Sequence, residues 1–150
     1  ACYQIASEGG ESPVGFMSKS IGLKKDLHSL SHGAGKSDDG YKNWSLWDQF
    51  ISKQLAHFIK RLKETPEAGE NLLDNCLLFQ GSATGKSHDP HNYPLILAGG
   101  KNMGHKAGQF IKYDEKKNAL SNLYVRIAQS MGVPVKKFGD SSGISMNELF

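Results

Sequence analysis

The chain has 150 residues, 38% of them apolar, with 18 lysines and arginines against 15 aspartates and glutamates. This length predicts one domain, and this apolar content can build a packed core, which excludes a wholly disordered chain. The longest apolar stretches, residues 76–79 and 95–98, are far too short to cross a membrane. The net charge of +3 is small and its lysines are scattered in pairs, which argues against a nucleic-acid partner.

The first 40 residues predict one strand and two loops. A strand is expected over residues 1–7, starting at the first residue without an initiator methionine or a signal-type segment. Such a start suggests either a piece of a longer protein or an edge strand at a mature terminus. A punctuated loop over residues 8–21 is expected next, followed by a long loop over 22–40 that is rich in His, Gly, Ser and Lys. Loops of that length in a compact domain are usually functional or disordered.

The strongest structural signal is an amphipathic helix over residues 44–64. Its apolar residues recur at spacings of three and four, and the pattern ends before Pro66. We expect Trp44 and Trp47 to anchor the core on this stripe.

Shorter elements are expected in the second half of the chain. They are a turn over 66–71, a buried strand over 72–80, a strand over 93–98, an edge strand over 109–113, a helix over 120–131 and a turn-rich tail over 135–150. This alternation of helix and strand predicts a single α/β domain over 1–150, with a mixed or parallel sheet flanked by helices.

Two glycine-rich segments look like phosphate loops, but neither fits the Walker pattern. In residues 81–87 the first required glycine is replaced by Gln80, and in residues 33–37 it is replaced by Leu30. Nucleotide hydrolysis of the Walker type is therefore not expected.

The histidines are the better candidates for chemistry. Two clusters stand in the predicted loops, and their candidate metal ligands are Asp26, His28, His32, His88, Asp89 and His91. Imidazole and carboxylate groups that converge from loops at strand ends suit a divalent metal site or an acid–base pair. The alternative is that these side chains are only caps and hydrogen-bond partners in polar loops.

The cysteines restrict the kind of metal site. Cys2 and Cys76 cannot form a closed structural zinc site, and both are expected to be buried free thiols. A metal would therefore be held by histidine and carboxylate groups with open positions.

The sequence resembles a bacterial family of unknown function that is named for its His-x-x-Ser-His-His motif. His28-Ser29-Leu30-Ser31-His32-Gly33 follows that motif up to its last position, where Gly33 replaces a histidine. Further blocks resemble the family in the same order: residues 5–9, 72–76, 81–82, 87–88, 92–100, 120–124, 131–133 and 138–141. The resemblance covers nearly the whole chain.

The resemblance implies that the chain is part of a longer, exported protein. Family members are longer, exported proteins, and the matching region is their C-terminal part, so a missing N-terminal portion or a partner subunit is expected. A more distant similarity links the family to the alkaline-phosphatase-like superfamily, in which a strand-end Asp/His pair helps to hold divalent metals. If that link holds, this piece alone should be catalytically incomplete.

Two functions of different kinds are compatible with these patterns. One is a metal-dependent hydrolase of phosphate or sulfate esters, with zinc as the favoured metal and with Lys86 and Asn92 contacting the anionic substrate. The other is a non-catalytic structural or binding component of an assembly or oligomer with a degenerate site. In that case Trp47, Phe50 and Phe58 would act through an exposed patch or through a partner subunit.

Overall fold

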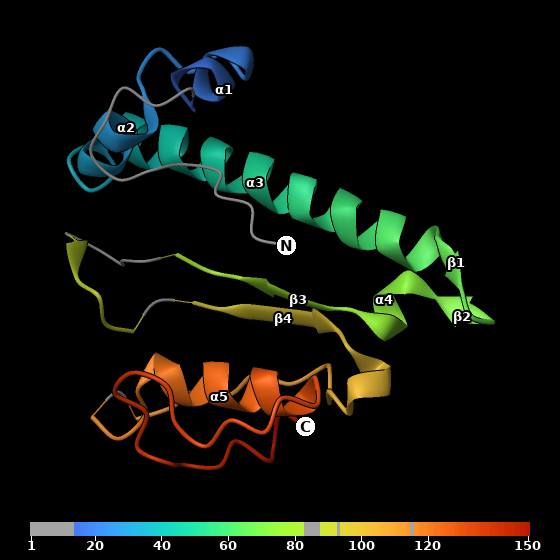
Figure 1. The fold of residues 1–150 in the computed structure, drawn as a ribbon. Helices are drawn as coiled ribbons and strands as arrows, with labels where there is room; N and C mark the ends of the chain where they lie inside the picture. The colour runs from blue at the N-terminus through green and yellow to red at the C-terminus, as the bar shows by residue number, and fades with distance from the viewer. Residues whose placement is uncertain (1–13, 83–87, 93, 115) are drawn as a thin grey trace. The chain divides into compact units, whose positions relative to one another are not determined.

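The computed structural model describes residues 14–82, 88–92, 94–114 and 116–150, and combines helices with short strands (Figure 1). This is the mixed helix-and-strand composition expected from the sequence. The chain divides into two compact units, Ala1–Phe58 and Ile59–Phe150. The strand expected over residues 1–7 lies outside the described residues. Among the described helices, none has the length and apolar character needed to span a membrane.

The first unit contains three helices, α1 (Val14–Ser20), α2 (Leu27–Gly33) and most of α3 (Asp38–Glu64). Its buried core consists of Leu23, Leu30 and Trp47. The partly buried side chains packed against this core are Met17, Ile21, Leu27, Trp44, Phe50 and Ile51. The expectation that the tryptophans anchor the core is therefore confirmed.

The two loops expected before residue 40 are corrected by the structure. Helix α1 occupies residues that were expected to be loop, and α2 lies inside the long loop. The reason is tertiary packing. Leu30 of α2 belongs to the buried core with Trp47, and Met17 of α1 packs against that core. This burial offsets the weak helical pattern of these polar segments.

Helix α3 confirms the predicted amphipathic helix and extends it at its start, to Asp38. Ser37 holds this earlier start, because its Oγ accepts a hydrogen bond from Gly40 N at 3.1 Å. Its carbonyl oxygen accepts a second one from Tyr41 N at 3.1 Å.

The second unit begins with a tight hairpin and a short helix. Strands β1 (Pro66–Glu67) and β2 (Glu70–Asn71) pair antiparallel around Ala68 and Gly69, whose φ angles are 49° and 85°. Two positive φ angles are typical of a type I′ turn, so the expected turn is confirmed. Asn71 then caps α4 (Leu72–Asn75), because its Oδ1 accepts a bond from Asp74 N at 3.0 Å.

The strand predicted over 72–80 is therefore shorter than expected. Strand β3 covers Leu77–Gln80 and pairs antiparallel with β4 (Ile96–Gly99). The sequence predicts a mixed or parallel sheet, whereas both sheets in the described residues are antiparallel pairs. The chain turns after Gly99 into the 3₁₀ helix η2 (Lys101–Met103).

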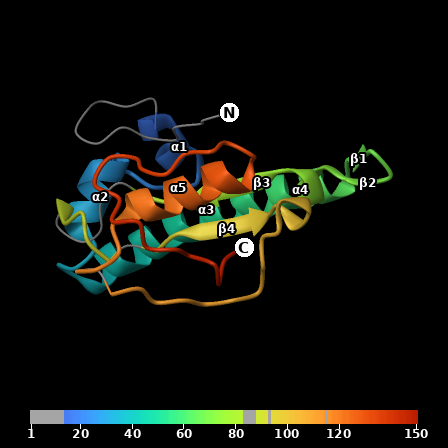
Figure 2. The same ribbon diagram turned by 60° about the horizontal axis from the view of Figure 1, so that its bottom comes forward.

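Helix α5 (Leu120–Ser130) confirms the second predicted helix and lies beside the β3–β4 sheet in both views (Figures 1 and 2). The rings of Phe79 and Tyr124 meet edge to face, with centroids 5.8 Å apart. The buried Asn122 of α5 also holds the tail: it donates to Ser142 Oγ at 3.0 Å and accepts from Ser142 N at 2.9 Å. As expected, residues 135–150 form turns without a helix or strand.

The edge strand predicted over 109–113 is wrong, because these residues form neither a helix nor a strand. Phe110, in the middle of this segment, is 95% exposed. Gln109 instead donates to the carbonyl oxygens of Lys106 and Glu148, at 2.8 and 2.9 Å. Tyr113 donates its hydroxyl proton to the Glu148 carboxylate, and these bonds tie the segment to the tail.

Candidate metal site

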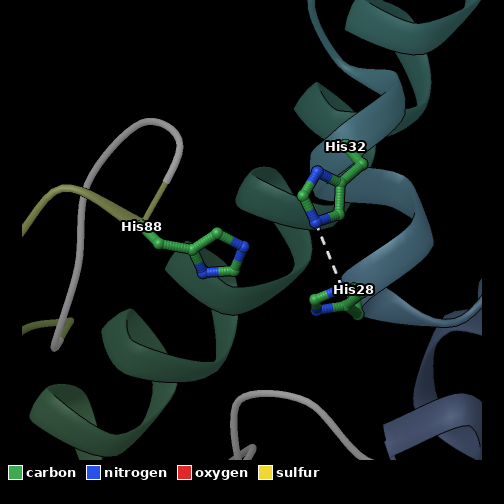
Figure 3. Close-up of side chains that lie close together, drawn as sticks. All are labelled: His28, His32 and His88. Carbon is green, nitrogen blue, oxygen red and sulfur yellow. Dashed lines mark hydrogen bonds between the residues drawn. The ribbon is translucent and has the colours of Figure 1, made fainter.

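Helix α2 places His28 and His32 on one exposed face. Residues four apart on a helix lie one above the other, so the two imidazoles become neighbours. Their Nε2 atoms are 3.1 Å apart and their ring centroids 4.6 Å apart (Figure 3). The sequence predicted both histidines in a loop; the helix is what brings their ligand atoms together.

Asp26 is the N-cap of α2 and stabilises the start of the helix at Leu27. It has an extended backbone, and its Oδ1 accepts a hydrogen bond from Ser29 N at 2.9 Å. Its Oδ2 accepts a second bond from Ser29 Oγ at 2.7 Å. The backbone N–H of Ser29 is the main cause that lowers the pKa of Asp26, and the Ser29 hydroxyl adds to it. Asp26 is therefore an N-cap in this structure, and its role as a metal ligand stays a prediction.

The spacing of the two Nε2 atoms suits a shared metal ion. Two imidazole nitrogens bound tetrahedrally to zinc, each at roughly 2.0–2.1 Å, lie about 3.3 Å apart. The 3.1 Å in the protein is close to that distance. The same geometry also allows a hydrogen bond from one neutral imidazole to the other. The pair can therefore share a proton or chelate a cation with little movement.

The second histidine cluster belongs to the other unit. His88 is exposed and has a positive φ of 62°. His91 meets Asp89 through Nδ1 and Oδ1 at 2.5 Å, and its backbone N–H donates to the same oxygen at 3.1 Å. The side-chain bond from His91 is the main cause that lowers the pKa of Asp89. A carboxylate on Nδ1 fixes the imidazole ring and directs Nε2 away, as the supporting carboxylates of metal-binding histidines do.

The structure places the remaining candidates as follows. Lys86 lies outside the described residues, and Asn92 is exposed with a positive φ of 52°. His105 has a structural role: its Nδ1 is 2.7 Å from the carbonyl oxygen of Gly99, and its ring packs against Phe150. Cys76 is a half-buried free thiol, and burial is the main cause that raises its pKa.

Known proteins offer no direct guide to this site. Comparison of the chain with family models, curated proteins and solved structures gives no match. The resemblance to the His-x-x-Ser-His-His family therefore stays a prediction, and the case for a function rests on the geometry of the histidines.

Proposed function

We propose that this chain is part of a divalent-metal-dependent hydrolase of phosphate or sulfate esters, with His28 and His32 as metal ligands. The observation that carries the proposal is the 3.1 Å between their Nε2 atoms on the exposed face of α2. A pair of histidines four residues apart on one helix face is a recurrent zinc-binding arrangement.

His88 is proposed as the third ligand. It is exposed, and it follows Ser87 in the second histidine cluster of the sequence. Three histidines around zinc leave a fourth position for water or substrate, which is the pattern of catalytic rather than structural zinc.

The other candidates have supporting roles in this proposal. His91, held by Asp89, accepts or donates a proton at Nε2. A bound zinc ion would supply a water of lowered pKa and would polarise an oxygen of the ester. An alkaline-phosphatase-like context, an exported location and a longer parent protein are part of the same proposal.

Hydrolysis of a phosphate ester and of a sulfate ester, by the chain supplied with zinc, tests the activity. Turnover that requires the metal and is lost in His28→Ala supports the proposal. The matched control is His57→Ala, which removes an exposed histidine of α3 and should leave turnover unchanged. Zinc binding without turnover would instead favour the non-catalytic component.

The non-catalytic alternative relies on an exposed aromatic patch, and fewer of its residues are exposed than that alternative requires. Trp47 is only 4% exposed and belongs to the core of the first unit, so it cannot contribute to an exposed patch. Phe50 is partly buried against the same core, and only Phe58, 49% exposed, lies on the surface as the alternative requires.

A further inference from the structure

The first unit contains a pocket of about 520 Å³, formed by the α1–α2 connection, α2 and the start of α3. A volume of roughly 300–1,000 Å³ is typical of sites for small molecules. Its lining combines the core leucines Leu23 and Leu30 with lysine, serine, aspartate and asparagine side chains. None of the histidines is among them.

The walls of the pocket are fixed by core packing and by the close approach of α2 to α3. Leu23 and Leu30 belong to the buried core, so its apolar wall is fixed by packing. A Cβ atom at Gly40 would overlap with the carbonyl oxygen of Gly33, so only glycine allows the end of α2 to approach α3 this closely. Ser37 fixes the first turn of α3 beside this contact.

The charge around the pocket is unbalanced. Three exposed lysines, Lys24, Lys25 and Lys36, line it against a single carboxylate, that of Asp39. None of these three lysines forms an ion pair with another residue in the described part of the chain. Lysine binds phosphate as a compact point charge. Three ammonium groups against one carboxylate leave the lining with a net positive charge, which favours a multiply charged oxyanion.

We propose that this pocket binds a small molecule that carries a phosphate or sulfate group. Lys24, Lys25 and Lys36 would neutralise the oxyanion, and Ser29, Ser37 and Asn43 offer hydrogen bonds for the rest of the ligand. The site does not depend on the proposed hydrolase, because no metal ligand lines it.

Calorimetric titration of the full chain with inorganic phosphate, pyrophosphate and sulfate tests the proposal. A chelator and about 150 mM salt remove metal-bridged binding and screen diffuse attraction. The pocket variant is Lys24→Gln/Lys25→Gln/Lys36→Gln. The matched control is Lys19→Gln/Lys42→Gln/Lys53→Gln, which removes the same charge from exposed lysines of the same unit that do not line the pocket.

We expect saturable binding at one site, with affinity about tenfold or more lower in the pocket variant and changed less than about twofold in the control. The comparison of phosphate with sulfate shows which oxyanion the pocket prefers. Absence of saturable binding, or equal losses in the two variants, would overturn the proposal. If the pocket variant does not fold by circular dichroism, Lys36→Gln alone must show the loss.

A His28→Ala/His32→Ala variant separates the two proposals. It should keep the wild-type affinity for these anions under chelator, whatever becomes of metal binding or ester hydrolysis. A loss of anion binding in this variant would contradict a separate pocket.

Discussion

His28 and His32 lie with their Nε2 atoms 3.1 Å apart on the exposed face of α2, one helical turn from each other. The hydrogen bonds of Ser29 to the Asp26 carboxylate hold the start of that helix. The close approach of the two imidazoles therefore depends on a short helix, and the helix depends in part on its cap.

The zinc affinity of the chain should depend on both members of the histidine pair. Replacing His28 or His32 by alanine removes one of the two nitrogens, and we expect each change to weaken zinc binding by more than about a hundredfold, beyond the loss typical of supporting residues. Competition with a chromophoric chelator measures this. His57→Ala, on the exposed surface of α3, should bind like the wild type. Equal zinc affinities in the wild type and in all three variants would show that His28 and His32 are not zinc ligands.

Acid should weaken the start of α2 through Asp26. Its pKa is lowered in the folded chain, below an ordinary value of 3.8, chiefly because Ser29 N–H donates to it. The stability that this carboxylate contributes is therefore present above its ordinary pKa and is lost as the pH falls through its lowered value.

In Asp26→Asn the capping oxygen is neutral, so this pH-dependent contribution disappears. Urea midpoints from about pH 5 to about pH 2 should fall more steeply for the wild type than for the variant. Near pH 6 the two should differ little, because asparagine also caps helices well. Parallel pH profiles would contradict the role of the Asp26 charge.

Gly40 should be intolerant of alanine, contrary to the usual preference for alanine inside helices. A Cβ atom there would overlap with the carbonyl oxygen of Gly33, and we expect Gly40→Ala to lower the free energy of unfolding by about 1–3 kcal/mol. The control is Gly33→Ala, where a Cβ meets nothing within 4 Å. It should be neutral or stabilising by up to about 1 kcal/mol. Urea denaturation of both variants checks the contrast, and equal effects would refute the close approach.

Asn122 should be more important for stability than the serine that it contacts. It is 2% exposed and makes two hydrogen bonds to Ser142. Asn122→Ala leaves both groups of Ser142 without this partner, and we expect a loss of about 2 kcal/mol in unfolding free energy. Ser142→Ala removes the hydroxyl but keeps the backbone bond, so its loss should be about 1 kcal/mol. The reverse order, measured by urea denaturation, would contradict this arrangement of the tail.

The sequence predicted those elements whose own apolar residues repeat with a clear period. Helix α3 was predicted because its stripe recurs every three or four residues, and only its polar start, from Asp38, was missed. Helix α2 was missed because its residues, apart from Leu27 and Leu30, are polar or glycine. Its one usable signal was Asp26, a residue that is common at N-caps, directly before Leu27.

The candidate site was predicted in part for the same reason. Spacing identified His28 and His32 as a pair, but only a helix brings two residues four apart to 3.1 Å. In the sequence, Lys24 and Lys25 are only one of several scattered lysine pairs. The pocket that they line with Lys36 depends on how α2 and α3 pack, which no local pattern predicts. The link from Asn122 to Ser142 spans 20 residues, so no local period predicts it.

The most direct test of the metal site is the metal content per chain, measured by mass spectrometry on protein purified without chelator. The His28→Ala/His88→Ala variant is measured beside the wild type. We predict about one zinc or other divalent ion per wild-type chain and almost none in the variant. No metal in either protein, even after reloading with zinc, would contradict the proposed site.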